Sequence, residues 1–449
     1  MRSWYSLAAT VVLLASISSA RGQSPIALAN WGQWRGPLGT GASPQGNPPT
    51  EWSETKNVQW KVPIPGHGTS TPVIWGDKVF VQTALSARSS AGSSSAKGDA
   101  PAKKGKGGFG GAPPPTDPYR FVLMCLDRNT GKTLWEKVCR EQVPHEGFRP
   151  GDGSFAAASA ITDGQSVFAF FGSRGLFCFD MSGALKWEKD LGDQETRNDF
   201  GEGATPALHG NTIVVPWDHE DEDFVVALDK RSGDELWRQP RDEPTGWATP
   251  LIAEHGGSPQ VITIGTNRTR SYDLASGRQI WETEGLTANV IPTPVAAGGV
   301  AYVTSGFRGS KLLAIKLGAT GDITGTPAVL WRLDQDTPYV PSPLLSGQRL
   351  YFFKSNNNIL TCLDAASGKP HYSAQRIDGL GTVYPSPVAA AGRVYLTDRR
   401  GKTVVIKDAN QLEVLATNSI AEPIDASPAV VGKQMFLRSH SSLYCIAEK

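Results

Sequence analysis

CLDRNTGKTLW (residues 125–135) returns with small changes as ALDKRSGDELW (227–237), SYDLASGRQIW (271–281) and CLDAASGKPHY (362–372). In each copy an Asp can accept backbone N–H groups of a turn, and a Gly allows the positive φ that brings the chain back as an antiparallel strand. The turn residues are Asp127 with Gly131, Asp229 with Gly233, Asp273 with Gly277, and Asp364 with Gly368. Four copies of one hairpin predict a repeat architecture built from short strands.

The repeat unit around this turn begins with a Thr/Ser-Pro step and an apolar strand. Its prolines are spaced by 44, 44, 49, 44 and 41 residues, and they are Pro206, Pro250, Pro294, Pro343, Pro387 and Pro428. Pro72 opens the first unit, and Ala160 takes the proline position in the second. A unit of this length holds four short strands, which predicts one blade of a β-propeller.

A Trp strand closes most units. These tryptophans are Trp60, Trp135, Trp187, Trp237, Trp281 and Trp331. A buried Trp covers roughly 150–250 Å², so its burial contributes on the order of 4–6 kcal/mol before opposing terms are counted. We therefore expect these six residues to be structural.

The two ends of the chain complement each other. The last unit, Ser427 to Ile446, stops before its Trp strand, and NVQWKV (57–62) carries Trp60 without a unit of its own. Joining the two covers both sheet edges. The sequence thus predicts an all-β fold over residues 57–449, an eight-bladed β-propeller of four-stranded antiparallel blades in which an N-terminal strand completes the C-terminal blade. Its least regular units are the fifth, KLGATGDITGTPAVLW (316–331), and the seventh, VIKDANQLEVL (405–415).

Three segments stand outside the repeat. Arg2, an apolar run over residues 7–17 and small residues at 18–20 predict a signal peptide over 1–22, cleaved after Ala20 or Gly22. Residues 23–56 form an N-terminal extension with the motif WGQWRGP. Residues 86–118, rich in Ser, Ala, Gly, Lys and Pro, predict a disordered low-complexity insertion in blade one. It is either a tolerated loop expansion or a tether for an acidic partner through Lys97, Lys103, Lys104 and Lys106.

Charge and apolar runs exclude some classes of function. Forty-four Lys and Arg stand against 43 Asp and Glu, so no global field favours nucleic acid. No apolar run after the signal peptide is long enough to span a membrane. We expect an exported monomer, periplasmic or extracellular.

The five cysteines do not suggest disulfides. Four share one repeat phase and so belong to different blades, where we expect small buried side chains: Cys125, Cys178, Cys362 and Cys445. Cys139 is expected to be a free thiol.

The Asp-turn motif with its Trp resembles the tryptophan-docking motif of pyrroloquinoline-quinone (PQQ) repeat proteins along essentially the whole mature chain. WGQWRGPLGTG (31–41), residues 49–77, FGSRGLFCFD (171–180) and PYVPSPL (338–344) resemble exported quinoprotein-like propellers of planctomycete bacteria, which are often named after the BamB-type propeller. The resemblance supports the fold. It implies two different functions.

Quinoprotein alcohol dehydrogenases hold PQQ beneath a vicinal disulfide, with Ca²⁺ and a catalytic Asp. This chain has no Cys-Cys pair and lacks their Asn-Pro-x-Pro-Trp segment, although Trp247 in GWATP is placed to present a ring at the channel mouth. PQQ with Ca²⁺ is therefore an open alternative that the cysteines do not support. BamB-type proteins are anchored through a lipidated Cys at the cleavage site. The first Cys here is Cys125, so we expect no lipid anchor.

Candidate ligand-binding residues fall on loops that would line the channel of a propeller. Basic hairpin tips carry Arg174, Arg268 with Arg270, Arg308, and Arg399 with Arg400. On one face they would form an anion or polysaccharide site; otherwise they are solvated tips. Residues 218–223 (DHEDED) offer oxygen ligands for Ca²⁺ without the spacing of an EF-hand, so a solvated hairpin is the alternative.

No metal or catalytic site follows from the remaining residues. The histidines occur singly without metal-ligand spacing: His67, His145, His209, His255, His371 and His440. An intact repeat without a catalytic constellation favours a non-catalytic scaffold that binds a protein or envelope component. A quinone-dependent dehydrogenase and a carbohydrate-binding propeller with exposed aromatic residues are the alternatives.

Overall fold

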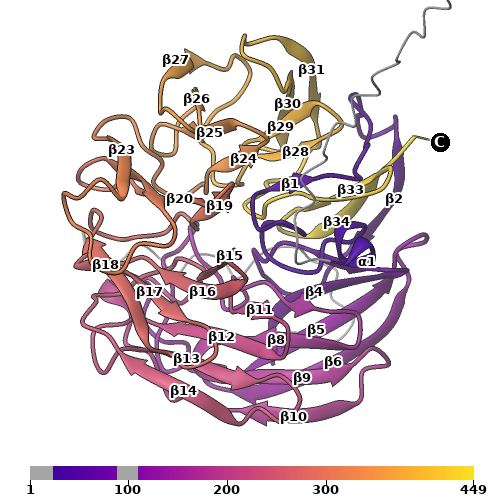
Figure 1. Cartoon of the computed structure of the whole chain (residues 1–449). Helices are drawn as coiled ribbons and strands as arrows, with labels where there is room; N and C mark the ends of the chain where they lie inside the picture. Colours follow the sequence, from indigo (N-terminus) through magenta and orange to yellow (C-terminus); the bar gives the residue numbers. More distant parts are fainter. Residues whose placement is uncertain (1–23, 88–109, 449) are drawn as a thin grey trace, which may run out of the picture.

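The computed structural model describes residues 24–87 and 110–448, and the strands of this part of the chain form eight sheets arranged as a ring (Figure 1). Each sheet contains the four antiparallel strands of one blade, which confirms the predicted eight-bladed propeller. The predicted signal peptide lies outside the described residues, as does the segment 88–109 of the predicted insertion.

The strand bounds follow the repeat in the first four blades. Blade one contains β3 (Val73–Trp75), β4 (Lys78–Ser86), β5 (Tyr119–Asp127) and β6 (Thr133–Gln142). Blade two contains β7 (Ile161–Thr162), β8 (Ser166–Phe170), β9 (Leu176–Asp180) and β10 (Leu185–Lys189). Blade three contains β11 (Ala207–His209), β12 (Thr212–Trp217), β13 (Phe224–Asp229) and β14 (Glu235–Pro240). Blade four contains β15 (Leu251–His255), β16 (Ser258–Thr263), β17 (Arg268–Asp273) and β18 (Gln279–Glu284).

The remaining blades have the same order. Blade five contains β19 (Val295–Ala297), β20 (Val300–Ser305), β21 (Lys311–Lys316) and β23 (Val329–Leu333). Blade six contains β24 (Leu344–Ser346), β25 (Arg349–Phe353), β26 (Ile359–Asp364) and β27 (Pro370–Arg376). Blade seven contains β28 (Val388–Ala390), β29 (Arg393–Thr397), β30 (Lys402–Lys407) and β31 (Val414–Ser419). Blade eight contains β32 (Ala429–Val431), β33 (Gln434–Arg438), β34 (Ser442–Ile446) and β2 (Val58–Pro63).

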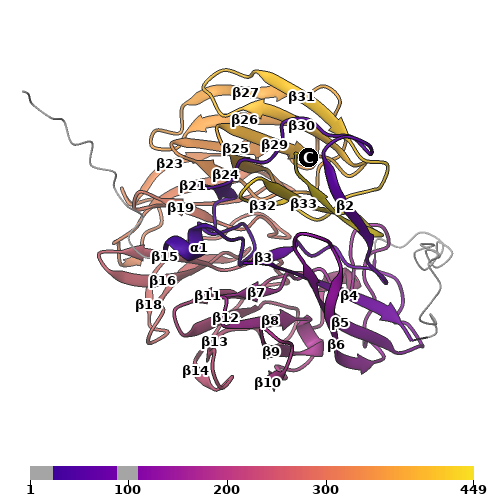
Figure 2. The same ribbon diagram turned by 90° about the vertical axis from the view of Figure 1, so that its right-hand side faces the viewer.

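The ring is closed by the N-terminal strand, as predicted. β2 pairs antiparallel with β34, and Trp60 lies opposite Cys445. Both views show the indigo β2 beside the yellow strands of the last blade (Figures 1 and 2). Because the ring is closed, each blade packs between two neighbouring blades.

The irregular units five and seven both form blades, and two sheets carry an additional strand. In blade five the extended turn contains β22 (Gly321–Asp322), which crosses to pair parallel with β18 of blade four. In blade seven β1 (Ala42–Ser43) pairs parallel with the inner strand β28. The long fifth turn therefore covers the outer edge of the preceding blade.

The tryptophans join neighbouring blades. The indole N–H of Trp135 donates to Met181 O (3.4 Å), that of Trp187 to Lys230 O (3.0 Å) and that of Trp237 to Leu274 O (2.8 Å). Each acceptor follows the turn Asp of the next blade. Trp281 instead donates to Gln260 Oε1 (3.0 Å) in its own blade, because blade five lacks the Asp turn.

A belt of hydroxyl groups encircles the channel where the inner strands begin. The backbone N–H just before one inner strand donates to the Ser or Thr hydroxyl at the same position in the next blade. The donor-acceptor pairs are Thr71–Ser159, Ser159–Thr205, Thr205–Thr249, Thr293–Ser342, Ser342–Ser386 and Ser386–Ser427, at 2.9–3.2 Å. This inner belt explains the recurring Thr/Ser before Pro in the sequence.

The N-terminal extension fills the channel. After the short helix α1 (Pro25–Leu28), residues 30–43 contact inner strands all around the ring, and we call this segment the channel plug. Trp31 bridges Ile74 of β3, the carbonyl of Gly32 accepts from Thr162 of β7, and the carbonyl of Thr40 accepts from Leu345 of β24. The sequence did not predict this position of the WGQWRGP motif.

Two ends of the ring differ in their connections. One end carries the hairpins between the second and third strands and the connections between blades; we call it the loop face. The opposite end carries the two tight turns of each blade, including the Asp turns; we call it the turn face. No helix in the described part of the chain has the length and apolar character needed to cross a bilayer.

All five cysteines are unpaired. Cys125, Cys178, Cys362 and Cys445 lie buried in β5, β9, β26 and β34, and Cys139 is half-buried in β6. Burial raises the pKa of the Cys125 thiol to about 12, so these thiols are small apolar side chains at neutral pH.

Candidate functional site

The predicted basic residues all belong to the loop face. Arg174, Arg268, Arg308, Arg399 and Arg400 lie in or beside hairpins between the second and third strands of their blades. They do not form one continuous anion site, because most of them pair with carboxylates of their own surroundings. Each pairing is local to one or two blades.

Arg399 is the most extensively bound of these residues. Its Nε and Nη2 donate to Asp425 (2.6 and 2.9 Å), and Nη1 donates to Asp152 Oδ1 (3.1 Å). Its guanidinium lies 3.9 Å from the ring centroid of Tyr384, a cation–π contact. The neighbouring Arg400 pairs with Asp398 (2.8 Å) and is exposed.

The basic residues of blades four and five differ in burial. Arg270 is largely buried between Asp242 (2.7 Å) and Glu282 (3.3 Å). Arg268 is exposed, 3.8 Å from Asp322. Arg308 is exposed and lies 5.4 Å from the ring centroid of Phe307. These arginines lie on the loop face but do not surround a common site.

Arg174 is not a solvated tip. It ends the 3₁₀ turn Gly172–Arg174, which folds inward, and only 4% of its surface is exposed. Its Nη1 lies 3.5 Å from Asp193 Oδ1, and its Nη2 donates to His145 Nδ1. His145 in turn donates from Nε2 to Gln194 O (2.7 Å).

Two glutamates, the buried Glu146 and the half-buried Glu202, complete this charged cluster, which comprises His145, Glu146, Arg174, Asp193 and Glu202. Thr196 donates its backbone N–H (3.0 Å) and hydroxyl (2.7 Å) to Glu146. Ser173 donates its N–H (2.7 Å) and hydroxyl (2.5 Å) to Glu202. Burial raises the pKa of Glu202 to about 7, against the lowering effect of the Ser173 hydrogen bond and Arg174.

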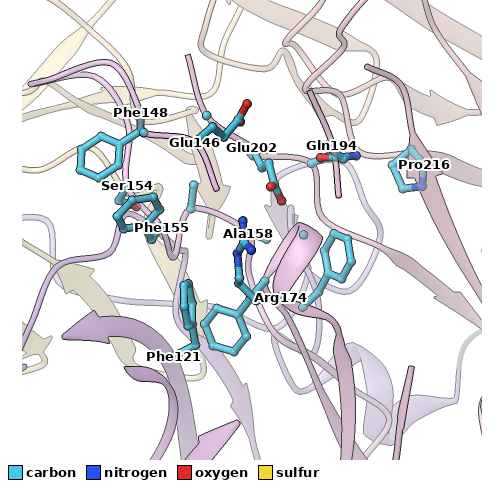
Figure 3. A pocket seen from close by; sticks show the side chains of 18 residues that line it. Phe121, Glu146, Phe148, Ser154, Phe155, Ala158, Arg174, Gln194, Glu202 and Pro216 are labelled. Carbon is cyan, nitrogen blue, oxygen red and sulfur yellow. The ribbon is translucent and has the colours of Figure 1, made fainter. Parts of the chain in front are cut away.

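A cavity of about 30 Å³ adjoins the charged cluster (Figure 3). Phe121, Phe148, Phe155 and Phe171 form its apolar wall, and Glu202 and Arg174 face each other across it. Sites for small organic ligands enclose about 300–1,000 Å³, whereas one water needs about 10–15 Å³ of such space. The cavity therefore has room for water or a single ion.

The charged cluster includes three groups with the ligand atoms of a metal site. Single ligand atoms of His145, Glu146 and Glu202 lie within 4.8 Å of one another. Both carboxylates already accept two hydrogen bonds, and His145 Nδ1 faces the Arg174 guanidinium. Ca²⁺ takes six to eight oxygen ligands. The residues present do not fit a Ca²⁺ site, because only two of the three side chains offer oxygen ligands and the Nδ1 of His145 is already bound by Arg174.

Trp247 lies next to this region with its polar edge bound. Its indole N–H donates to Gly201 O (2.7 Å), and its ring centroid is 6.5 Å from that of Phe200. The indole is partly exposed at the channel mouth, near Gly203. It supports the connection between blades two and three.

A long connection crosses the loop face. Residues 143–155, which follow β6 and which we call the bridging loop, extend from blade one to blade seven. Asp152 of this loop accepts from the Tyr384 hydroxyl (2.9 Å) and from Arg399 (3.1 Å). Together the bridging loop and the channel plug obstruct the channel from both ends.

A groove of about 440 Å³ opens between blades seven and eight on the loop face. Its wall carries both charged and apolar groups and is formed by Gly381, Thr382, Arg399, Arg400, Pro423, Asp425 and His440. His440 Nε2 donates to Asp425 Oδ2 (2.9 Å), and the His67 ring centroid is 5.4 Å from that of His440. Two histidines that are single in the sequence thus lie together at this groove.

The acidic tip at 218–223 is engaged within the protein. Asp218 forms a buried ion pair with Arg241 (2.6 Å), Asp223 accepts from the backbone of Glu243 (2.7 Å), and Glu220 accepts from Thr245 (2.8 Å). Asp218 and Asp223 are buried, so the solvated-hairpin interpretation is wrong for both. These acidic side chains bind the connection between blades three and four, which follows β14.

The sequence analysis missed Tyr384 against Arg399, Asp425 in the groove, and Glu146 and Glu202 in the charged cluster. A repeat signal marks the first two: Trp247, Tyr384 and Asp425 each stand three residues before the proline that opens an inner strand. That position lies at the channel mouth in each blade. The glutamates have no equivalent signal, because Glu146 lies in the non-repeating bridging loop.

Comparison with known proteins agrees with the fold. The family model of the outer membrane protein assembly factor BamB matches residues 120–254 and 221–449. No curated protein matches the sequence. The crystal structure of BamB from Moraxella catarrhalis has a TM-score of 0.52 and 14% identity, over 74% of this chain and 95% of that one.

Enzymes share the architecture as well. Quinohemoprotein alcohol dehydrogenase from Comamonas testosteroni has a TM-score of 0.58 and 10% identity, over 94% of this chain and 81% of that one. A europium-containing methanol dehydrogenase has a TM-score of 0.50 and 9% identity, over 94% of this chain and 98% of that one. At these identities the likeness concerns the fold alone.

Proposed function

Since the chain is a PQQ-like β-propeller that belongs to the family of the outer membrane protein assembly factor BamB, we propose that it is an exported binding scaffold for a protein or another envelope component. The partner binds on the loop face. The predicted signal peptide supports export to the periplasm or the exterior.

One observation carries this proposal: the larger of the two cavities described above is the groove on the loop face. The groove between blades seven and eight measures about 440 Å³, which is within the range of ligand sites. The cavity at the charged cluster measures about 30 Å³. Arg400 and Thr382 are exposed at the groove and accessible to a partner. Arg399 is instead fixed by its hydrogen bond to Asp425.

The quinone-dependent alternative has less support from the site. Two glutamates line one cavity, and Trp247 donates to Gly201 of the same lining, which is the feature in its favour. The cavity is smaller than a tricyclic quinone. The carbohydrate-binding alternative rests on Phe307 and Tyr339, whose rings stack on each other at 4.7 Å and so cover one face each.

The test places a photo-cross-linking residue at Thr382 in the groove and, as control, at Asn211 in the turn between β11 and β12 on the turn face. In the native host, we expect discrete cross-linked products from position 382 and none from 211. Equal products from both positions, or none from either, would count against a specific loop-face partner.

Charge variants refine the same test. Arg400→Gln removes a loop-face cation paired with Asp398, and Arg231→Gln removes a turn-face cation paired with Asp229 in a similar hairpin. We expect only the first to reduce cross-linking at position 382. Identical yields in the two variants would place the contact elsewhere.

A further inference from the structure

Arg35 of the channel plug is buried inside the ring. Only 1% of its surface is exposed. Its Nη2 donates to the carbonyls of Pro343 (3.0 Å) and Pro387 (2.9 Å), which immediately precede the inner strands β24 and β28. The guanidinium therefore lies at the level of the inner belt.

This guanidinium has no acidic partner in the described part of the chain. No carboxylate there forms an ion pair with it, and its Nε and Nη1 are buried without a hydrogen-bond acceptor. Arg241 is equally buried but pairs with Asp218 through two nitrogens (2.6 and 3.1 Å). Burial lowers the pKa of Arg35 to about 9, whereas Asp218 raises that of Arg241 despite its burial.

Arg438, in β33 of blade eight, repeats the situation. It is 2% exposed, its Nη1 donates to the Ser70 hydroxyl just before the inner strand β3, and its Nε has no acceptor. Among residues 24–87 and 110–448 no carboxylate pairs with it either, and burial lowers its pKa to about 9. Two buried arginines thus leave the belt level with uncompensated positive charge.

Water can satisfy the free N–H groups, but it does not neutralise the charge. A buried ion without a counter-ion is strongly disfavoured. Arg174 in the charged cluster differs, because its Nη1 lies 3.5 Å from the carboxylate of Asp193. An additional anion is therefore favoured at Arg35 and not at Arg174.

We propose that the channel binds one small anion of a single negative charge, a halide or a simple carboxylate, on Nη1 of Arg35. The ligand is small because the plug and the bridging loop obstruct the channel. It binds the folded state, in which the Arg35 side chain is fixed by two carbonyls, so its binding stabilises the seated plug by mass action.

The direct experiment is a crystal of the full protein soaked in bromide, with anomalous diffraction data. We expect an anomalous peak within hydrogen-bond distance of Arg35 Nη1. If excess acetate removes this peak, the site binds carboxylates as well as halides. Persistence of the peak in acetate would restrict the site to halides. Bromide on the surface only, with water at Arg35, would overturn the proposal.

Solution measurements give an independent test. At constant ionic strength, replacing gluconate by chloride should raise the Tm of the wild type saturably and leave that of Arg35→Met unchanged. Arg231→Met, which alters an exposed arginine on the turn face, should respond like the wild type. Equal chloride responses in all three proteins would contradict the proposal. If Arg35→Met does not fold, the bromide experiment alone tests the site.

Discussion

Arg399 Nη1 donates to Asp152 Oδ1 at 3.1 Å, although 247 residues separate the two in the sequence. This contact joins the bridging loop after blade one to the hairpin of blade seven. The same carboxylate accepts from Tyr384, against whose ring Arg399 packs. This aspartate therefore binds the bridging loop to blade seven.

Asp152→Asn should loosen the bridging loop without unfolding the ring. Asp152 and Arg399 are about three-quarters buried, so the loss of the charge should lower the free energy of unfolding by roughly 1 kcal/mol. Hydrogen exchange of residues 145–155 should accelerate. Glu413→Gln, which removes an exposed pair with Lys407, serves as control and should leave this exchange unchanged. An unchanged exchange rate in Asp152→Asn would show that other contacts hold the loop.

Trp60 should determine the stability of ring closure. Its indole N–H donates to Arg128 O (2.9 Å) in blade one. Trp60→Phe removes this bond and should cost about 1 kcal/mol, while Trp60→Ala also leaves a cavity and should cost about 3–5 kcal/mol. Urea unfolding measures both. As a control, Leu134→Ala alters an exposed residue of an outer strand and should change the free energy of unfolding by less than about 0.5 kcal/mol. A similar loss of stability in Leu134→Ala and Trp60→Ala would refute the role of Trp60 in ring closure.

Gly131 and Gly76 allow a matched comparison on the turn face. Both have a positive φ, +73° and +59°. A Cβ at Gly131 would lie 2.8 Å from the Trp60 ring, whereas one at Gly76 meets nothing within 4 Å. Backbone strain of about 1–2 kcal/mol applies to both alanine variants, and overpacking should add about 1–3 kcal/mol to Gly131→Ala only. Equal free energies of unfolding would mean that the docked Trp can move aside.

Glu202 should make stability dependent on pH. Its pKa rises from 4.5 in the unfolded chain to about 7 in the folded protein, so the folded state binds more protons between these values. Its contribution is therefore full below pH 4.5 and is lost as the pH rises through 7. Glu202→Gln, which cannot ionise, should gain about 1–3 kcal/mol relative to the wild type between pH 5 and pH 8. Thermal unfolding curves that shift in parallel over this range would contradict the raised pKa.

The repeat made the ring predictable, because Pro spacing, Asp turns and Trp strands report local hairpins whose order along the chain is their order in space. The closing strand followed from one unmatched Trp60. Contacts between distant, non-repeating segments had no such signal. The position of Arg35 depends on carbonyls 308 and 352 residues away, and the turn containing β22 reaches back to an earlier blade.

The candidate site was less predictable than the fold for the same reason. The sequence left open whether the basic tips share one face; the structure places them on the loop face, and their burial depends on what covers them. Arg174 is buried because its turn folds inward toward the bridging loop, and Arg399 is held by Asp152 of that loop. Repeat position thus predicts which face a residue occupies, and not whether it is free to bind a partner.

We propose that this propeller binds partners on its loop face and holds no quinone. The most direct measurement is a calorimetric titration of the purified protein with PQQ and Ca²⁺, followed by dye reduction with alcohols and sugars. We predict no saturable heat and no turnover, because the cavity beside Glu202 measures about 30 Å³, which is too small for a tricyclic quinone. Stoichiometric PQQ binding accompanied by dye reduction would contradict the account.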